Sequence, residues 1–215
     1  MQRIPALLLL GFAGVAGTSG AIISEIFMGI GTWQSRIAIA DSTYDTGKKA
    51  RFYGPAGVAV DAAGTVYVAD TGDNTIRKIS PAGRVGTLAG YKGISGNDDG
   101  IGAAAYFVGP TDVAVDAAGT VYVADTGNNT IRRISPAGEV STWAGIAHTE
   151  GNRNGTGAAA RFNSPVGIAV DVTGTVYVAD AGNHRIRRIT PAGVVGTLAG
   201  AGPGSNEPRT YKHRD

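Results

Sequence analysis

The sequence repeats itself with a period of 55 residues. Residues 119–140 read GTVYVADTGNNTIRRISPAGEV, and nearly the same letters begin at Gly64 and again at Gly174. No insertion disturbs this spacing. Self-similarity at a fixed period is typical of stacked supersecondary units, because one such unit cannot bury its apolar faces alone. The chain is therefore expected to fold as a row of near-identical units.

Within one unit, the local signals all indicate β-strands. In the first copy, four runs rich in valine, isoleucine, threonine or tyrosine are separated by short turn segments such as Ala-Ala-Gly and Pro-Ala-Gly. The expected strands are residues 57–61, 65–70, 75–80 and 84–88. Repeated four-stranded antiparallel units of this length are typical of blades of a β-propeller, whereas a β-solenoid would need shorter repeats.

The composition agrees with a strand-rich and turn-rich fold. The 215 residues include 34 glycines, 43% of them are hydrophobic and only 17% are charged. This favours many tight turns around an apolar core over long solvated helices. Cysteine is absent, so disulfides do not hold the fold together.

The repeated pattern P-x-G-I/V-A-V-D-x-x-G-x-V-Y-V-A-D-x-x-N-x-x-I-R-x-I resembles the NHL repeat of β-propellers. The third copy matches it best, from Pro165 to Ile189, and it includes the tetrapeptide N-H-R-I at residues 183–186. The other two copies have Asn-Thr in place of His184-Arg185, a change that affects a turn and leaves the strands unaltered. The resemblance covers about residues 29–200 and implies an all-β propeller.

The number of blades raises the question of how the fold closes. Residues 30–33 align with residues 85–88, so we expect them to form the outermost strand of a preceding blade, followed by three complete blades. Closed propellers have about four to eight blades. Three blades in an open row would expose two apolar sheet faces. Either two copies assemble head to tail into a six-bladed ring, the number common in the resembling family, or the chain is a piece of a longer protein.

The first 21 residues resemble a secretory signal peptide. A positive start at residues 1–3 precedes an apolar run at residues 4–16 and a group of small residues. Export would place the protein in a secreted or periplasmic setting. The alternative is an uncleaved membrane anchor, although the apolar run is shorter than the ~20 residues of a spanning helix. The expected organisation is a signal peptide at 1–21, an outer strand and connector at 22–53, NHL blades at 54–108, 109–163 and 164–200, and a tail at 201–215.

Two aspartate positions recur in every copy. The first set is Asp61, Asp116 and Asp171, and the second set is Asp70, Asp125 and Asp180. The first set closes the innermost expected strand, where a ring of carboxylates around the channel could hold a hard cation such as calcium. The favoured alternative is that each carboxylate accepts hydrogen bonds from the N–H groups of the adjoining turn. The second set is interpreted as turn-stabilising by the same logic.

A basic pair follows the second aspartate in each copy, at residues 77–78, 132–133 and 187–188. Every copy thus sets two aspartates beside two basic residues, so we expect these charges to pair within and between blades. The net charge of +2 supplies no electrostatic footprint for nucleic acid, and no nucleic-acid partner is predicted.

An enzyme is the alternative from a different functional class. The resemblance extends to six-bladed metal-dependent lactonases and lyases, whose sites use histidine or carboxylate ligands at the mouth of the channel. His148, His184 and His213 share no spacing, and the sequence contains neither a G-x-S-x-G elbow nor a cysteine nucleophile. No catalytic residue and no resident metal or cofactor are therefore assigned.

The connectors between blades differ from one another, although the blades are nearly invariant. Residues 90–107 and 145–162 are both long and rich in glycine, and each ends in a phenylalanine that we expect to anchor the connector in the core, as Phe52 does in the first copy. Asp98-Asp99-Gly100 hints at calcium, but the ligand pattern of a calcium loop is missing and the next copy has Arg-Asn-Gly, so this segment is interpreted as a turn.

Binding residues tend to lie on loops that a rigid scaffold holds in place. The candidate partner-binding residues are accordingly Tyr91, Lys92, Asn97, Asp98, Asp99, His148, Glu150, Asn152 and Arg153. The sequence predicts a non-catalytic interaction module that binds protein or glycan.

Overall fold

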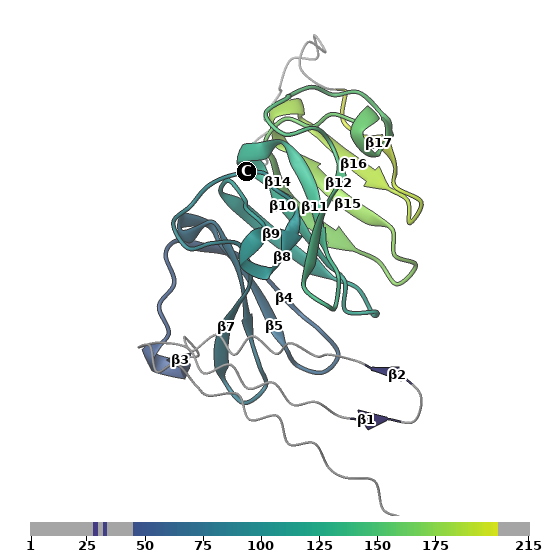
Figure 1. The fold of residues 1–215 in the computed structure, drawn as a ribbon. Coiled ribbons are helices and arrows are strands. Elements are labelled where there is room, and N and C mark those ends of the chain that lie inside the picture. The colour runs from purple at the N-terminus through teal and green to yellow at the C-terminus, as the bar shows by residue number, and fades with distance from the viewer. Residues whose placement is uncertain (1–27, 30–31, 34–44, 202–215) are drawn as a thin grey trace, which may run out of the picture. The chain divides into compact units, whose positions relative to one another are not determined.

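The computed structural model describes residues 28–29, 32–33 and 45–201, and these residues form β-strands joined by turns and short 3-10 helices (Figure 1). The chain divides into two units at residue 43. In the first unit, β1 (Met28–Gly29) pairs antiparallel with β2 (Thr32–Trp33). The signal peptide and most of the tail expected from the sequence lie outside the described residues. Among the helices that the structure describes, none has the length and apolarity to cross a membrane.

The second unit contains three sheets, one for each sequence repeat. The first blade consists of β4 (Pro55–Val60), β5 (Val66–Asp70), β6 (Thr75–Ile79) and β7 (Arg84–Ala89). The second consists of β9 (Pro110–Val115), β10 (Val121–Asp125), β11 (Thr130–Ile134) and β12 (Glu139–Ala144). The third consists of β14 (Pro165–Val170), β15 (Val176–Asp180), β16 (Arg185–Ile189) and β17 (Val194–Ala199). Within each blade neighbouring strands pair antiparallel in chain order, which confirms the predicted four-stranded blade.

Each sheet has in addition a two-residue fifth strand, which the sequence did not predict. The added strands are β3 (Asp45–Thr46), β8 (Gly100–Ile101) and β13 (Gly155–Thr156), and they pair with β7, β12 and β17. Each leads into a short helix: η1 (Gly47–Lys49), η3 (Gly102–Ala104) or η5 (Gly157–Ala159). Two residues are too few to show the alternation by which a strand is predicted. Consequently, the end of each connector belongs to the sheet of the following blade.

The turn between the second and third strands of each blade is a single 3-10 turn. These turns are η2 (Thr71–Asp73), η4 (Thr126–Asn128) and η6 (Ala181–Asn183). Each ends at a residue in the left-handed region, namely Asn74, Asn129 and His184, with φ angles of 55°, 58° and 53°. Asparagine and histidine enter this region more readily than most side chains. The backbone of the turn is thus unchanged at His184, but the prediction that the difference leaves the strands unaltered was wrong, because Arg185 is the first residue of β16.

The core lies between the blades. Alternate residues of a strand point to opposite faces of its sheet, and one face of the second blade packs against the first blade while its other face packs against the third. Between the first and second blades, Tyr67, Ala69 and Ile76 contribute from one side, and valines such as Val113 and Val123 from the other. The same positions of the second and third blades form the second cluster. We call these two interfaces the first and the second joint.

Candidate partner-binding surface

A buried ion pair fastens the first complete connector to its blade. Arg132 Nη1 lies 2.9 Å from Asp125 Oδ2, and both side chains are completely buried. The same guanidinium donates to the carbonyl oxygens of Tyr106 and Asp98, each at 3.0 Å, and to the Asp99 carboxylate at 2.7 Å. One buried cation thus holds residues 98–106 in place, because its donors are arranged in a rigid fork.

The third blade repeats this arrangement. Arg187 Nη1 lies 2.7 Å from Asp180 Oδ2, again with both side chains fully buried. Its Nη2 donates to the Arg153 carbonyl at 3.1 Å and to Asn154 Oδ1 at 2.8 Å. The amide oxygen of Asn154 thus takes the place of the Asp99 carboxylate. In the first blade the pair between Arg77 and Asp70 is longer, at 3.3 Å, and Arg77 is slightly exposed.

Two phenylalanines at the ends of the connectors complete these anchors. Phe107 and Phe162 are fully buried, and the guanidinium groups of Arg132 and Arg187 lie 5.2 Å from the respective ring centroids. A cation over an aromatic face is favourable, and more so when both groups are desolvated. The prediction that the phenylalanines anchor the connectors in the core is confirmed for Phe107 and Phe162, whereas Phe52 is only partly buried.

The role predicted for the second set of aspartates was wrong in part. Asp70, Asp125 and Asp180 make no side-chain hydrogen bond to the backbone of the turn that follows. Asp125 Oδ1 instead accepts from the N–H of Val108, at 2.8 Å, and Oδ2 accepts from the Asn128 amide. The carboxylate points along the sheet toward the arginine of the next strand. Burial raises the pKa of Asp125, while these hydrogen bonds and the charge of Arg132 oppose the shift.

The first set of aspartates does bind the adjoining turn. Asp61 Oδ1 accepts from the N–H groups of Ala63 and Thr65, at 2.9 and 2.8 Å, and Oδ2 accepts from the Tyr67 hydroxyl at 3.1 Å. Asp116 and Asp171 make the equivalent bonds. The Thr65 N–H is the main cause that lowers the pKa of Asp61. Within the described ranges, no group of three or more histidines and acidic residues is placed to hold a metal ion, and these three aspartates do not form one.

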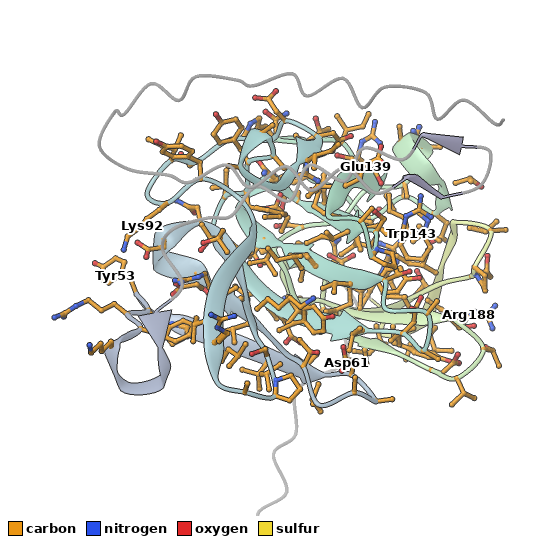
Figure 2. All side chains as sticks on the ribbon, turned by 60° about the horizontal axis from the view of Figure 1, so that its bottom comes forward. Tyr53, Asp61, Lys92, Glu139, Trp143 and Arg188 are labelled. Atoms are coloured by element: carbon orange, nitrogen blue, oxygen red, sulfur yellow. The ribbon has the colours of Figure 1, made fainter. Side chains whose placement is uncertain are left out.

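The tip of the first connector, at residues 91–94, folds against the turn η2. Tyr91 and Ile94 are about half exposed, at 55% and 49%. Figure 2 labels the side chain of Lys92. Its Nζ atom lies 3.2 Å from Asp73 Oδ2. The Gly93 N–H donates to the carbonyl oxygen of Asp73, at 2.9 Å. Ile94 was not among the predicted residues, although an isoleucine in a glycine-rich loop was a signal that could have indicated it.

The tip of the second connector, at residues 146–150, folds against η4 in the same way. The His148 N–H donates to the carbonyl oxygen of Asn128, at 3.1 Å, and His148 adopts a left-handed φ of 58°. The Asn128 amide donates to the carbonyl oxygen of Gly96 in the first connector, at 2.8 Å. Asn128 therefore joins the two connectors, and the two tips lie at the same end of the blades.

The structure separates the nine predicted residues into two groups. Asp99 and the backbone of Asp98 and Arg153 are bound to the buried arginines, and Arg153 Nε donates to the Ala159 carbonyl. These three residues hold the connectors in place. The remaining six are exposed at the same end of the blades: Tyr91, Lys92, Asn97, His148, Glu150 and Asn152. We call these six residues, with Ile94 and Ile146, the tip surface.

One further polar residue, Asp112, was missed by the sequence reasoning. It lies on β9, and its Oδ2 accepts from the Ile168 N–H of the third blade at 2.9 Å. The equivalent positions in the other blades are Gly57 and Gly167. Asp112 could have been identified from the sequence, because an aspartate replaces the glycine of the other two copies in an inner strand.

The comparisons with known proteins agree with this architecture. The family model of the NHL repeat matches residues 52–79, 107–134 and 162–189. The chain belongs to the NHL-repeat β-propeller family. Each match begins at a connector phenylalanine and ends in the third strand of its blade, so the connector tips lie outside the matched NHL segments.

Relatives of this NHL-repeat chain are much longer proteins. Teneurin-3 of Danio rerio is 37% identical over 117 residues, which cover 46% of this chain and 4% of teneurin-3. NHL repeat-containing protein 2 of Homo sapiens is 31% identical over 152 residues, which cover 65% of this chain and 21% of the relative. The chain therefore spans only a small part of the curated relatives that it matches.

Among solved structures, an auxiliary nutrient binding protein from Bacteroides thetaiotaomicron superposes with a TM-score of 0.56 at 25% sequence identity. The match covers 66% of this chain and 37% of that chain. An auxiliary nutrient binding protein from Bacteroides ovatus gives a TM-score of 0.55 at 22% identity, over 84% of this chain and 44% of the other. The second likeness supports the fold alone.

Proposed function

We propose that this NHL-repeat chain is a non-catalytic interaction module that binds a protein or glycan partner through its tip surface. The observation that carries the proposal is the contrast between constant blades and variable connectors, which Asn128 joins at one end of the fold. Loops held by a rigid scaffold are where binding residues concentrate.

The chemistry of the tip surface suits recognition of another molecule. Tyr91, Ile94 and Ile146 expose apolar area beside the charged or polar side chains of Lys92 and Glu150. Aromatic and apolar groups surrounded by polar ones are common in protein interfaces. Because the N–H groups of Gly93 and His148 already bind the tips to the adjoining 3-10 turns, partner binding would order few additional groups, and the entropic cost would be small.

The setting that we propose is secreted or periplasmic. It rests on the resemblance of residues 1–21 to a signal peptide. The structural likeness to an auxiliary nutrient binding protein supports a binding function for this chain. The alternative is a metal-dependent hydrolase or lyase of the lactonase type. It predicts metal-dependent turnover of a lactone or ester, which a non-catalytic module would not show.

The test compares three variants of the full chain on an array of oligosaccharides and on an array of purified extracellular proteins. Tyr91→Ser with Ile94→Ser alters the first tip, and Ile146→Ser with His148→Gly alters the second. Val172→Ser is the control, because Val172 is fully exposed in the turn between β14 and β15, at the other end of the strands. We expect both tip variants to lose binding at an unchanged melting temperature, and the control to keep it.

Two results would contradict the proposal. The first is binding that survives both tip variants. The second is turnover of a lactone or ester that a metal chelator or Asp116→Asn abolishes without unfolding the protein, which would favour the enzyme.

A further inference from the structure

Every blade presents two different faces, and each joint buries one of each kind. The face toward the following blade carries tyrosine, alanine and isoleucine, as at Tyr67, Ala69 and Ile76. The face toward the preceding blade carries valine and isoleucine, as at Val113 and Ile168. We call them the forward face and the rear face. Because the two differ, the joint is heterologous, and each blade can extend the row in both directions.

Among the residues that the structure describes, none covers the inner strand on the rear face of the first blade. Val58 and Val60 on β4 are 66% and 63% exposed. Their equivalents are buried or half-buried in the joints, since Val113 is 3% and Ile168 is 8% exposed. Val68 and Val85, further out on the same face, are already buried. The unpaired part is therefore the inner strand, which is the strand that contacts the neighbouring blade in both joints.

The forward face of the third blade is unpaired in the same way. Ile186 is 41% exposed, whereas its equivalents Ile76 and Ile131 are fully buried. Leu198 is 53% exposed, and Ala199 is also exposed, although the equivalent Ala144 is fully buried. The chain thus exposes both halves of an interface that it forms twice internally.

We propose that a second copy of this chain covers these two faces, so that the forward face of each third blade packs against the rear face of the partner's first blade. A heterologous contact yields a ring where the rotation closes and an open filament where it does not. The described residues of two copies contain six blades, which lies within the range of about four to eight in closed propellers, whereas those of three copies contain nine. The proposal does not depend on the tip surface.

The contact between copies differs from the internal joints in its polar groups. In the first joint, the Thr71 hydroxyl donates to the Pro110 carbonyl, at 2.6 Å, and the Gly109 N–H donates to Asn74 Oδ1, at 2.8 Å. Thr126 and Asn129 make the same two bonds in the second joint, at 2.6 and 2.7 Å. The third blade has Ala181 and His184 at these positions. The contact between copies therefore keeps the apolar residues but lacks the threonine bond and replaces the asparagine, so it is weaker than the internal joints.

This asymmetry gives variants that act in opposite directions. Ala181→Thr with His184→Asn restores the two polar residues, and the first two blades show that the fold accepts both at these turn positions. Val58→Asp introduces a charge at a position that is exposed in one copy and would be buried between two. Val172→Asp is the control, since Val172 is fully exposed in a turn outside both faces.

The experiment is sedimentation velocity and light scattering of the full chain over a series of concentrations, with circular dichroism to confirm folding. We expect a reversible dimer of the wild-type chain. Val58→Asp should weaken it by at least about a hundredfold, because a buried unpaired charge is costly. Ala181→Thr with His184→Asn should tighten it by at least about thirtyfold, because the ring contains two such contacts and therefore gains four hydrogen bonds of ordinary strength. The control should leave the dissociation constant unchanged.

Several results would overturn the proposal. A folded monomer at every concentration would show that another chain segment or partner covers the faces. A series of oligomers that grows without a limit, or an aggregate, would show that the contact does not close at two copies. A dimer that tolerates Val58→Asp would show that the copies associate through a different surface.

Discussion

Arg132 Nη1 lies 2.9 Å from Asp125 Oδ2, and both side chains are fully buried. The guanidinium of Arg132 also donates to carbonyl oxygens of the connector. Removing one partner of a buried ion pair leaves an uncompensated charge and costs about 3–5 kcal/mol. We therefore expect Arg132→Met to lower the free energy of unfolding by about this amount in urea denaturation. Arg133→Met changes the exposed neighbouring residue and should stay within about 0.5 kcal/mol of wild type. Equal effects of the two substitutions would contradict the assignment.

Asp112 joins the second and third blades through the Ile168 N–H. Asp112→Ala leaves that N–H without its acceptor, which costs about 1–3 kcal/mol where the group is buried. Hydrogen exchange should report the change locally, with faster exchange at the Ile168 amide. The Val113 amide should respond as well, because its N–H donates to Asp112 Oδ1 at 2.9 Å, whereas amides of β6 in the first blade should exchange as before. Unchanged exchange at Ile168 would contradict this role.

Asp171 links stability to pH. Hydrogen bonds from the Thr173 hydroxyl and from the turn N–H groups lower the pKa of this carboxyl below its usual value. A lowered pKa in the folded state contributes stability that is present above the unfolded value of about 3.9 and is lost as the pH falls through the folded pKa. Wild type should therefore lose more stability than Asp171→Asn between pH 5 and the folded pKa. Urea denaturation at a series of pH values measures this, with Glu150→Gln as a variant of matched charge change. Parallel curves for wild type and Asp171→Asn would contradict the prediction.

Gly138 and Gly145 form a matched pair for testing close packing. Both have positive φ angles, 84° and 95°, so alanine is strained at either position. A Cβ atom at Gly138 meets no atom within 4 Å, whereas one at Gly145 would lie 2.7 Å from the carbonyl oxygen of Asn129. Gly138→Ala should cost about 1 kcal/mol. Gly145→Ala should lower the stability by clearly more, because the backbone at Asn129 must move to make room for the Cβ atom. Thermal unfolding of the two variants tests the difference, and equal melting temperatures would contradict it.

Much of the blade could be predicted because its signals are local. Alternating valines and tyrosines with turn triplets between them define four strands, and the turn bonds of Asp61 follow from an aspartate placed before x-x-Gly. The ion-pair partner of Asp125 could also have been predicted from the sequence. In the hairpin, Val123 pairs with Arg132, so Asp125 lies two positions from that pair on the same face of the sheet.

Other features depend on contacts between residues far apart in the chain. The bond from Arg132 to Asp99 spans 33 residues, and no local pattern indicates it. The strand β8 has only two residues, and it forms because it pairs with the outer edge of β12. The grouping of the tips depends on Asn128, which meets one connector through its side chain and the other through its backbone. These features could be predicted only once the stacking of the blades was known.

The short strands β8 and β13 define where one blade can be separated from the next. Residues 91–94 are bound to the turn of the preceding blade, whereas Gly96 and β8 are bound to the following one. The same division recurs one period later, between residues 149 and 151. A segment of 55 residues from Ser95 to Thr149 therefore carries its own sheet and its own anchoring arginine. Gene duplication or deletion with breakpoints there would lengthen or shorten the protein by one whole blade without dividing a hydrogen-bonded pair of strands.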